Sequence, residues 1–316
     1  MTAWLAKVAH KKARAVQYVH SANHIQRWID RRGSLSVKDI RPSTMEGFVK
    51  MRLEEGVRGE TVQTDLAALK AALKWASKEE IIDFMPNVGD VDKELRSTAR
   101  EIEYSQEQVA ALLEAAARRF DRQQVHLFTM IMLSCHARVE AVMELDASQI
   151  VRGRILFNAQ GRAQTSKRRP VVPVAPSLAP WLPGTGKVIV YRSQRKDGTI
   201  YERPTSSIKT SFRECLIDAG IVDSDGKAWG SPNSLRHTIH TYLQIVGVPQ
   251  AQIDAAAGHV QDGGGTGKNY THLRPEYLKE FIAAIENYWH EMDAFTSVHR
   301  SQVGPKIFDI KTGAVV

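Results

Sequence analysis

The chain has 316 residues, of which 43% are hydrophobic and 25% charged, and this composition is typical of globular proteins. No stretch approaches the roughly 20 apolar residues that a membrane span needs, and the first residues lack a secretory signal, so we expect a cytoplasmic protein without a membrane partner. A formal net charge of +8 favours an acidic partner, with nucleic acid ahead of an anionic membrane. The length predicts two domains.

Two stretches carry most of the positive charge. Residues 1–32 hold seven Lys or Arg against one acidic residue, and residues 151–213 hold thirteen against two. Each contact with a phosphate releases counterions, so two separated basic stretches suit a protein that binds a polyanion from two sides. The alternative is a solvated basic surface, and the presence of two runs in one chain favours nucleic acid.

Helical patterns dominate the first hundred residues. Ser21 is a candidate cap for a helix that ends at Gly33, and a capping box at residues 43–46 predicts a second helix that ends near Gly56. A third helix is predicted by one apolar stripe, formed by Val62, Leu66, Leu69 and Leu73. Residues 85–90 and the polar stretch after them predict a linker between domains.

Helices continue in the second half. Ser105 and Gln108 form a capping box, and residues 127–133 are apolar almost all round, as in a buried helix. Two later helices are predicted to end at glycines, and a last one begins at a proline; these residues are Gly220, Gly247 and Pro275. Cys135 and Cys215 lie in apolar helical patterns without CxxC spacing, so we expect reduced core residues.

A short segment changes to the strand period. Residues 149–157 predict a hairpin that turns at Arg152 and Gly153, and residues 171–174 predict a third strand. We therefore expect a mainly α protein with a small antiparallel β-sheet.

Two familiar site patterns are incomplete. Residues 263–268 are glycine-rich, but Asp262 and Asn269 stand where a phosphate loop needs Gly and Ser or Thr, so a mobile loop is the better interpretation. His237 and His240 lack the spacing and the Glu of HExxH, and we expect no metal site.

Five polar residues stand beside the predicted apolar elements. Arg138 follows the buried helix, Lys167 lies in a basic turn before the third strand, and Arg236 opens a later helix. His259 follows a helix end and a glycine, and Tyr270 comes just after the glycine-rich loop. This order resembles that of the tyrosine recombinase (phage integrase) family: Arg, Lys, His-x-x-Arg, His or Trp after Gly, then Tyr. The resemblance covers residues 15–290.

The resemblance implies a two-domain DNA clamp. Residues 1–97 would form an all-helical core-binding domain, and residues 98–290 an α+β catalytic domain. Residues 291–316 are a candidate tail for packing on a neighbouring protomer, the alternative being a disordered tail. The chain begins close to the core-binding domain, so we expect no separate domain for arm sites.

The resemblance also implies a chemistry: DNA strands are cut and rejoined through a covalent 3′-phosphotyrosine, with no metal or nucleotide cofactor. Tyr270 would be the nucleophile. Arg138 and Arg236 would bind the non-bridging oxygens, because planar guanidinium groups match phosphate geometry. Lys167 would protonate the departing 5′ oxygen, and His259 would hydrogen-bond the phosphate.

One position departs from the family pattern. Asn233 stands at the first position of His-x-x-Arg, and an amide cannot act as a base at neutral pH, so we expect slower chemistry. His237 is a candidate accessory residue beside Arg236, although a helix turns its side chain about 100° away.

Ordinary roles compete with several of these assignments. Arg138 could be an ion-paired surface residue, His259 a helix-capping residue and Tyr270 a core aromatic. Arg168 or Arg169 could take the role of Lys167. Five cations are candidate contacts to the DNA backbone: Arg162, Arg168, Arg169, Lys11 and Lys12.

The expected partner is double-stranded DNA, bound by a homotetramer because recombination joins two duplexes at four active sites. An accessory DNA-bending or directionality protein is a candidate partner. Two other functions stay open. One is a DNA-binding regulator on the same fold, with catalysis weakened by Asn233. The other is a monomeric, strand-relaxing topoisomerase.

Overall fold

The computed structural model describes residues 1–7, 10, 14–96, 102–164, 168–195, 197–259, 275–300, 308–309 and 314–315. The chain divides into two compact units, Met1–Arg100 and Glu101–Val316. Lys11, Lys12, Lys167, Tyr270 and the glycine-rich residues 263–268 lie outside the described residues.

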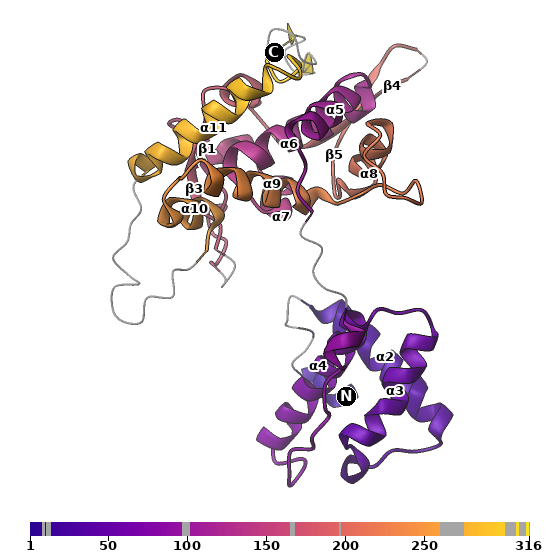
Figure 1. Cartoon of the computed structure of the whole chain (residues 1–316). Coiled ribbons are helices and arrows are strands. Elements are labelled where there is room, and N and C mark those ends of the chain that lie inside the picture. Colours follow the sequence, from indigo (N-terminus) through magenta and orange to yellow (C-terminus); the bar gives the residue numbers. More distant parts are fainter. Residues whose placement is uncertain are drawn as a thin grey trace. The chain divides into compact units, whose positions relative to one another are not determined.

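The first unit is helical (Figure 1). Its elements are α1 (Thr2–Lys7), α2 (Ala15–Arg32), η2 (Val37–Asp39), α3 (Pro42–Glu54), α4 (Gly59–Lys78) and η3 (Lys93–Leu95). Helix α4 packs against α2 and α3, and its predicted stripe of Val62, Leu66, Leu69 and Leu73 is buried. Trp28 of α2 and Phe48 of α3 meet edge to face, with ring centroids 5.9 Å apart.

Both predicted helix starts in this unit are wrong. Helix α2 begins at Ala15, well before Ser21, and the buried Ser21 hydroxyl donates to Asp65 Oδ1 (2.7 Å) instead of capping a helix. Helix α3 begins at Pro42, one residue before Ser43. The fixed φ of proline suits the first helical position, so no Ser cap is needed there.

The predicted linker at residues 85–90 is also wrong. Val88 and Val91 are buried in the core of the first unit. The backbone N–H of Val91 donates to Gln63 Oε1 (2.8 Å), and the Lys70 ammonium group lies 2.7 Å from Asp90 Oδ1. The Pro and Gly signals correctly indicated irregular backbone, but two apolar residues fix this segment on α4.

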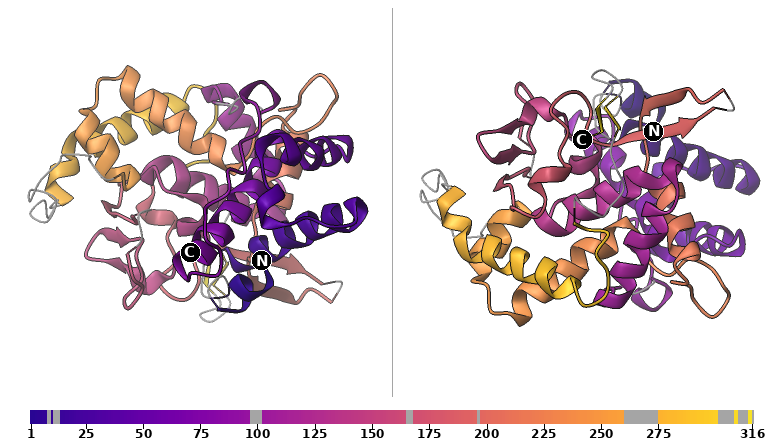
Figure 2. Two further views of the ribbon diagram at one scale, coloured as in Figure 1. Left: turned by 90° about the horizontal axis from the view of Figure 1, so that it is seen from below. Right: turned by 90° about the horizontal axis from the view of Figure 1, so that it is seen from above.

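The second unit is built around α6 (Gln123–Cys135), in which every residue after Gln123 is buried, as the apolar run predicted. Helices α5 (Gln106–Ala117), α7 (Val139–Met143), α8 (Lys209–Asp218) and α9 (Pro232–Ile245) contact α6. Helices α10 (Gln250–Ala257) and α11 (Lys279–Met292) pack on α9 (Figures 1 and 2). Short 3₁₀ turns connect them: η4 (Phe120–Arg122), η5 (Ala147–Gln149), η6 (Ala179–Trp181) and η8 (Pro275–Leu278).

Several local predictions are confirmed in this unit. The capping box of α5 is present, with Ser105 Oγ accepting from the Gln108 N–H and Gln108 Oε1 accepting in return. Cys135 and Cys215 are free and buried, and burial raises the pKa of the Cys215 thiol to about 11. Among the described residues, no helix is long and apolar enough to cross a membrane.

The predicted three-stranded sheet is present. Strands β1 (Ile150–Val151), β2 (Arg154–Leu156) and β3 (Val171–Pro173) are antiparallel in the order β1-β2-β3. Ile155 pairs with Val172, and both are fully buried. The turn at Arg152 and Gly153 has positive φ at both residues (51° and 70°), the conformation of a tight hairpin.

Two further strand pairs were not predicted. Strands β4 (Val190–Gln194) and β5 (Ile200–Pro204) form an antiparallel hairpin, and β6 (Phe308–Asp309) pairs with β7 (Ala314–Val315). The β4–β5 segment carries charged and polar residues at most positions, so it lacks the apolar alternation that indicates a half-buried strand.

The segment after α11 packs on its own unit as far as Arg300. His126 Nε2 lies 2.9 Å from the carbonyl oxygen of Val298, and Trp181 Nε1 donates to the carbonyl oxygen of His299 (3.0 Å). The His299 ring stacks on Trp289. Residues 291–300 of the predicted tail thus pack on their own unit, and packing of the tail on a neighbouring protomer stays a prediction.

Candidate active site

Arg138 stands where the central helix ends. Helix α6 closes on His136, which adopts the left-handed conformation (φ 50°), and Arg138 then has extended backbone and caps α7. The reversal turns the half-buried Arg138 guanidinium toward the carbonyl oxygen of Arg168, to which Nη1 donates (2.6 Å). Nη2 donates to the carbonyl oxygen of Gly258 (3.5 Å).

Arg236 lies one turn into α9, whose first turn is capped by Ser231. Its Nη1 donates to the carbonyl oxygen of His136 (2.6 Å) and its Nη2 to that of Ala257 (3.0 Å). Burial, and then the nearby charge of Arg138, lower the pKa of Arg236 to about 10. Arg236 therefore stays protonated at neutral pH.

The acceptors of these two arginines are all neutral oxygens of the backbone. Neither guanidinium has a carboxylate hydrogen-bond partner among the residues that the structure describes. Two positively charged guanidinium groups therefore lie close enough to repel each other, with neutral oxygens as their hydrogen-bond acceptors. An anion with several oxygens, such as a phosphodiester, fits this charge and the planar geometry of the donors.

His259 completes the group. Its Nε2 lies 3.1 Å from Arg236 Nη2, and its Nδ1 lies 3.4 Å from Asp254 Oδ1. Since arginine only donates, Nε2 is the acceptor of that bond, and the proton of the neutral ring is on Nδ1, directed toward the carboxylate. The side chain is 47% exposed, so a ligand can reach it.

Gly258 fixes the position of His259. It ends α10 in the left-handed conformation (φ 66°), and a Cβ there would clash with the carbonyl oxygen of Arg168. That same oxygen accepts from Arg138, so the segment before β3, the end of α10 and the end of α6 meet at one point. Lys167 directly precedes Arg168 in the sequence and is outside the described residues.

The accessory candidates are both exposed. Asn233 lies in the first turn of α9, and His237 follows Arg236 on the solvent side. No hydrogen bond of the Asn233 side chain is found within the described part of the chain. Both side chains are therefore open to solvent.

Two histidines that the sequence did not single out for this site lie near enough to Arg236 to feel its charge. The buried His136 ring and the half-buried His240 ring have centroids 5.1 Å apart. His240 follows Arg236 by four residues, which places both on one face of α9. Burial, and then the charge of Arg236, hold the pKa of His136 well below its ordinary value.

The three described candidates for DNA-backbone contacts differ. Arg168 is exposed. Arg162 is half-buried and donates to Asn158 Oδ1 (3.2 Å). Arg169 is buried and pairs with Glu144 (2.7 Å), so its guanidinium is engaged within its own unit, and its contact with the DNA backbone stays a prediction.

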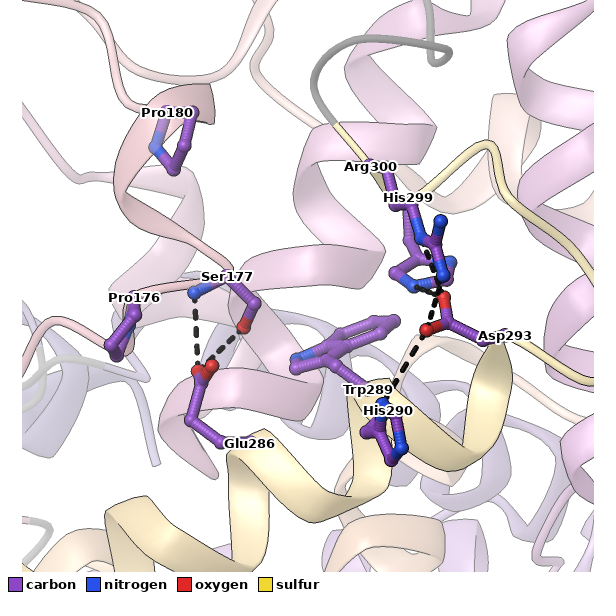
Figure 3. A pocket seen from close by; sticks show the side chains of 9 residues that line it. All are labelled: Pro176, Ser177, Pro180, Glu286, Trp289, His290, Asp293, His299 and Arg300. Atoms are coloured by element: carbon purple, nitrogen blue, oxygen red, sulfur yellow. Dashed lines mark hydrogen bonds and ion pairs between the residues drawn. The ribbon is translucent and has the colours of Figure 1, made fainter.

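A separate cavity of about 310 Å³ adjoins α11 (Figure 3). Glu286 accepts from the backbone N–H and the hydroxyl of Ser177, and Asp293 accepts from Arg300 Nε (2.7 Å) and lies 3.0 Å from His299 Nε2. None of the predicted site residues lines the cavity. Asp293 thus holds the segment after α11 in place, and Glu286 holds Ser177.

The sequence matches the phage integrase family over residues 104–276 and the N-terminal SAM-like domain of phage integrases over residues 5–80. The chain belongs to the phage integrase family. A search of curated proteins finds no match.

Solved integrase structures share the fold of this phage integrase family member. A lambda integrase dimer bound to a COC′ core site has a TM-score of 0.58 at 15% identity, covering 82% of this chain and 94% of that one. The Tn1549 transposon integrase in complex with transposon right end DNA has a TM-score of 0.60 at 16% identity, covering 90% of this chain and 96% of that one. A lambda integrase tetramer bound to a Holliday junction has a TM-score of 0.58 at 16% identity, covering 84% of this chain and 73% of that one.

Gly258→Ala tests the junction of the three segments. We expect it to lower the free energy of unfolding by about 1–2 kcal/mol through backbone strain, plus a further 1–3 kcal/mol because the new Cβ clashes with Arg168. Gly247→Ala is the matched control, since Gly247 also has positive φ (76°) but open space around it. Urea unfolding measures the stability of both variants. Equal losses of stability would contradict the close contact between Gly258 and the Arg168 carbonyl oxygen.

The neutral histidines predict a pH dependence. Burial also lowers the pKa of His240, so both histidines bind a proton less readily in the folded chain than in the unfolded chain, where the pKa of histidine is about 6.5. The free energy of unfolding should therefore fall as the pH drops below 6.5. His136→Asn keeps a residue that tolerates the left-handed backbone but removes the titration.

The measurement is urea unfolding of wild type and His136→Asn at pH 8 and at pH 5.5. The variant should lose less stability between the two pH values than wild type does. The same loss in both proteins would show that His136 is not held neutral by the fold.

Proposed function

We propose that this chain is a site-specific DNA recombinase or integrase that cuts and rejoins strands through a covalent 3′-phosphotyrosine. The observation that carries the proposal is the pair Arg138 and Arg236, held side by side with His259 on neutral carbonyl oxygens. Attack on a phosphodiester develops negative charge on the non-bridging oxygens. Preorganised guanidinium groups stabilise that charge without reorganising.

The proposed step is an in-line displacement at phosphorus. The Tyr270 hydroxyl releases its proton to solvent as its oxygen forms a bond to phosphorus. The bond from phosphorus to the 5′ oxygen breaks, and that oxygen leaves with the electron pair and takes a proton from Lys167. Attack by a 5′ hydroxyl reverses the step and restores the phosphodiester. Bond energy is conserved in the adduct, so no nucleotide is consumed, and the arginines replace a metal as the source of positive charge.

The DNA partner and the assembly follow from the same proposal. The partner would be double-stranded DNA, and the solved lambda integrase tetramer on a Holliday junction supports four copies acting together. Both basic stretches, in separate units, would bind backbone phosphates. An accessory DNA-bending or directionality protein fits such an assembly, and the reaction would take place in the cytoplasm.

Asn233 favours one alternative, a DNA-binding regulator on this fold. The amide is exposed beside Arg236 and can donate to a phosphate oxygen, but it cannot accept the proton that Tyr270 loses. We propose that catalysis is slower than it would be with His at this position.

Covalent trapping tests the proposed function. The protein is incubated with nicked duplexes that carry candidate junction sequences, in the presence of a chelator, and the mixture is denatured. We expect a protein–DNA adduct that resists denaturation in wild type and is absent in Tyr270→Phe. Asn233→His should accelerate its formation, because general-base catalysis is worth about 10²–10⁴-fold.

Two outcomes would contradict the proposal. Binding without any adduct, in wild type and in Asn233→His alike, would support the regulator. An adduct that persists in Tyr270→Phe would assign the nucleophile to another residue.

A further inference from the structure

The β4–β5 hairpin is a second basic surface outside the site. Its strands pair in full register from Val190↔Pro204 to Gln194↔Ile200, and its turn is closed by a bond from the Arg195 N–H to the Thr199 carbonyl oxygen (2.9 Å). Figures 1 and 2 show the hairpin extending away from the helices of its unit.

The two faces of the hairpin differ in charge. Side chains alternate along a strand, so Tyr191, Ser193 and Arg195 share one face, and the register adds their cross-strand partners Arg203 and Tyr201 to it. The opposite face carries Arg192, which pairs with Glu202 (3.0 Å) and is only 11% exposed. The only acid of the two strands thus lies on the opposite face.

On the Tyr191 face, each arginine lies over a tyrosine ring. The Arg203 guanidinium is 5.0 Å from the Tyr191 ring centroid, and that of Arg195 is 5.5 Å from the Tyr201 centroid. Both arginines are exposed, and neither has a carboxylate partner among the described residues. The ring contacts hold the guanidinium groups against the sheet but leave their donors free.

We propose that this face, formed by Tyr191, Ser193, Arg195, Tyr201 and Arg203, binds duplex DNA through its phosphates. Positive charge without local neutralisation suits a polyanion, and a two-stranded ribbon is narrow enough to enter the major groove between the phosphate rows. The inference rests on the proposed function, which assigns residues 151–213 to the DNA backbone, and it names the face of that stretch that makes the contact. It adds a contact surface separate from Arg138 and Arg236.

The test measures binding to the duplex poly(dA-dT), using Tyr270→Phe as the background so that no adduct forms. We expect Arg195→Gln/Arg203→Gln to reduce the slope of log affinity against log salt concentration by about 2, since each lost phosphate contact removes about 0.9. Both side chains are exposed, so folding should be unaffected. Arg195→Lys/Arg203→Lys keeps the charges and should restore the slope.

The control is Arg118→Gln/Lys227→Gln, which removes the same charge from two exposed residues that pair with Glu114 and Asp225. Its slope should equal that of the background. The proposal is overturned if the hairpin variant keeps the background slope, or if the control loses as much. The readout is independent of strand cleavage, so the failure of covalent trapping leaves this result separately interpretable.

Discussion

The site depends on one constraint: two guanidinium groups are bound by backbone carbonyl oxygens, three of which lie at the ends of helices. A helix leaves its last carbonyl groups without intrahelical bonds. Arg236 donates to the carbonyls of His136 and Ala257, at the ends of α6 and α10, and Arg138 donates to Gly258 and Arg168. The helix ends need donors and the arginines need a fixed position, so one set of bonds meets both requirements.

This constraint explains the unusual backbone nearby. His136 and Gly258 adopt left-handed conformations because each must turn its carbonyl toward an arginine while the chain reverses direction. Carbonyl oxygens carry no formal charge, so the arginines remain unneutralised, and burial together with their mutual repulsion lowers the pKa of Arg236 to about 10. A bound phosphate would remove this repulsion, which makes the site most favourable when an anion occupies it.

Local signals predicted the parts of the fold that depend on local physics. The apolar run of α6, the capping box of α5 and the turn at Arg152 and Gly153 are each set by neighbouring residues. The sequence did not predict the role of a side chain where that role depends on a residue far along the chain. Ser21 bonds to Asp65 rather than capping a helix, and Arg169 bonds to Glu144 rather than facing solvent. The order of Arg138, Arg236 and His259 predicted a shared site, but not the carbonyl groups that hold it, because backbone acceptors leave no mark in the sequence.

The most direct test of the arginine site is Arg236→Lys in single-turnover adduct formation. Lysine keeps the charge but loses the planar fork that bonds to His136 and Ala257. The account predicts that the rate falls by about 10²–10³-fold, while affinity for intact DNA changes by less than about tenfold. An unchanged rate, or a loss of rate no larger than the loss of affinity, would contradict a role for Arg236 in stabilising the developing charge.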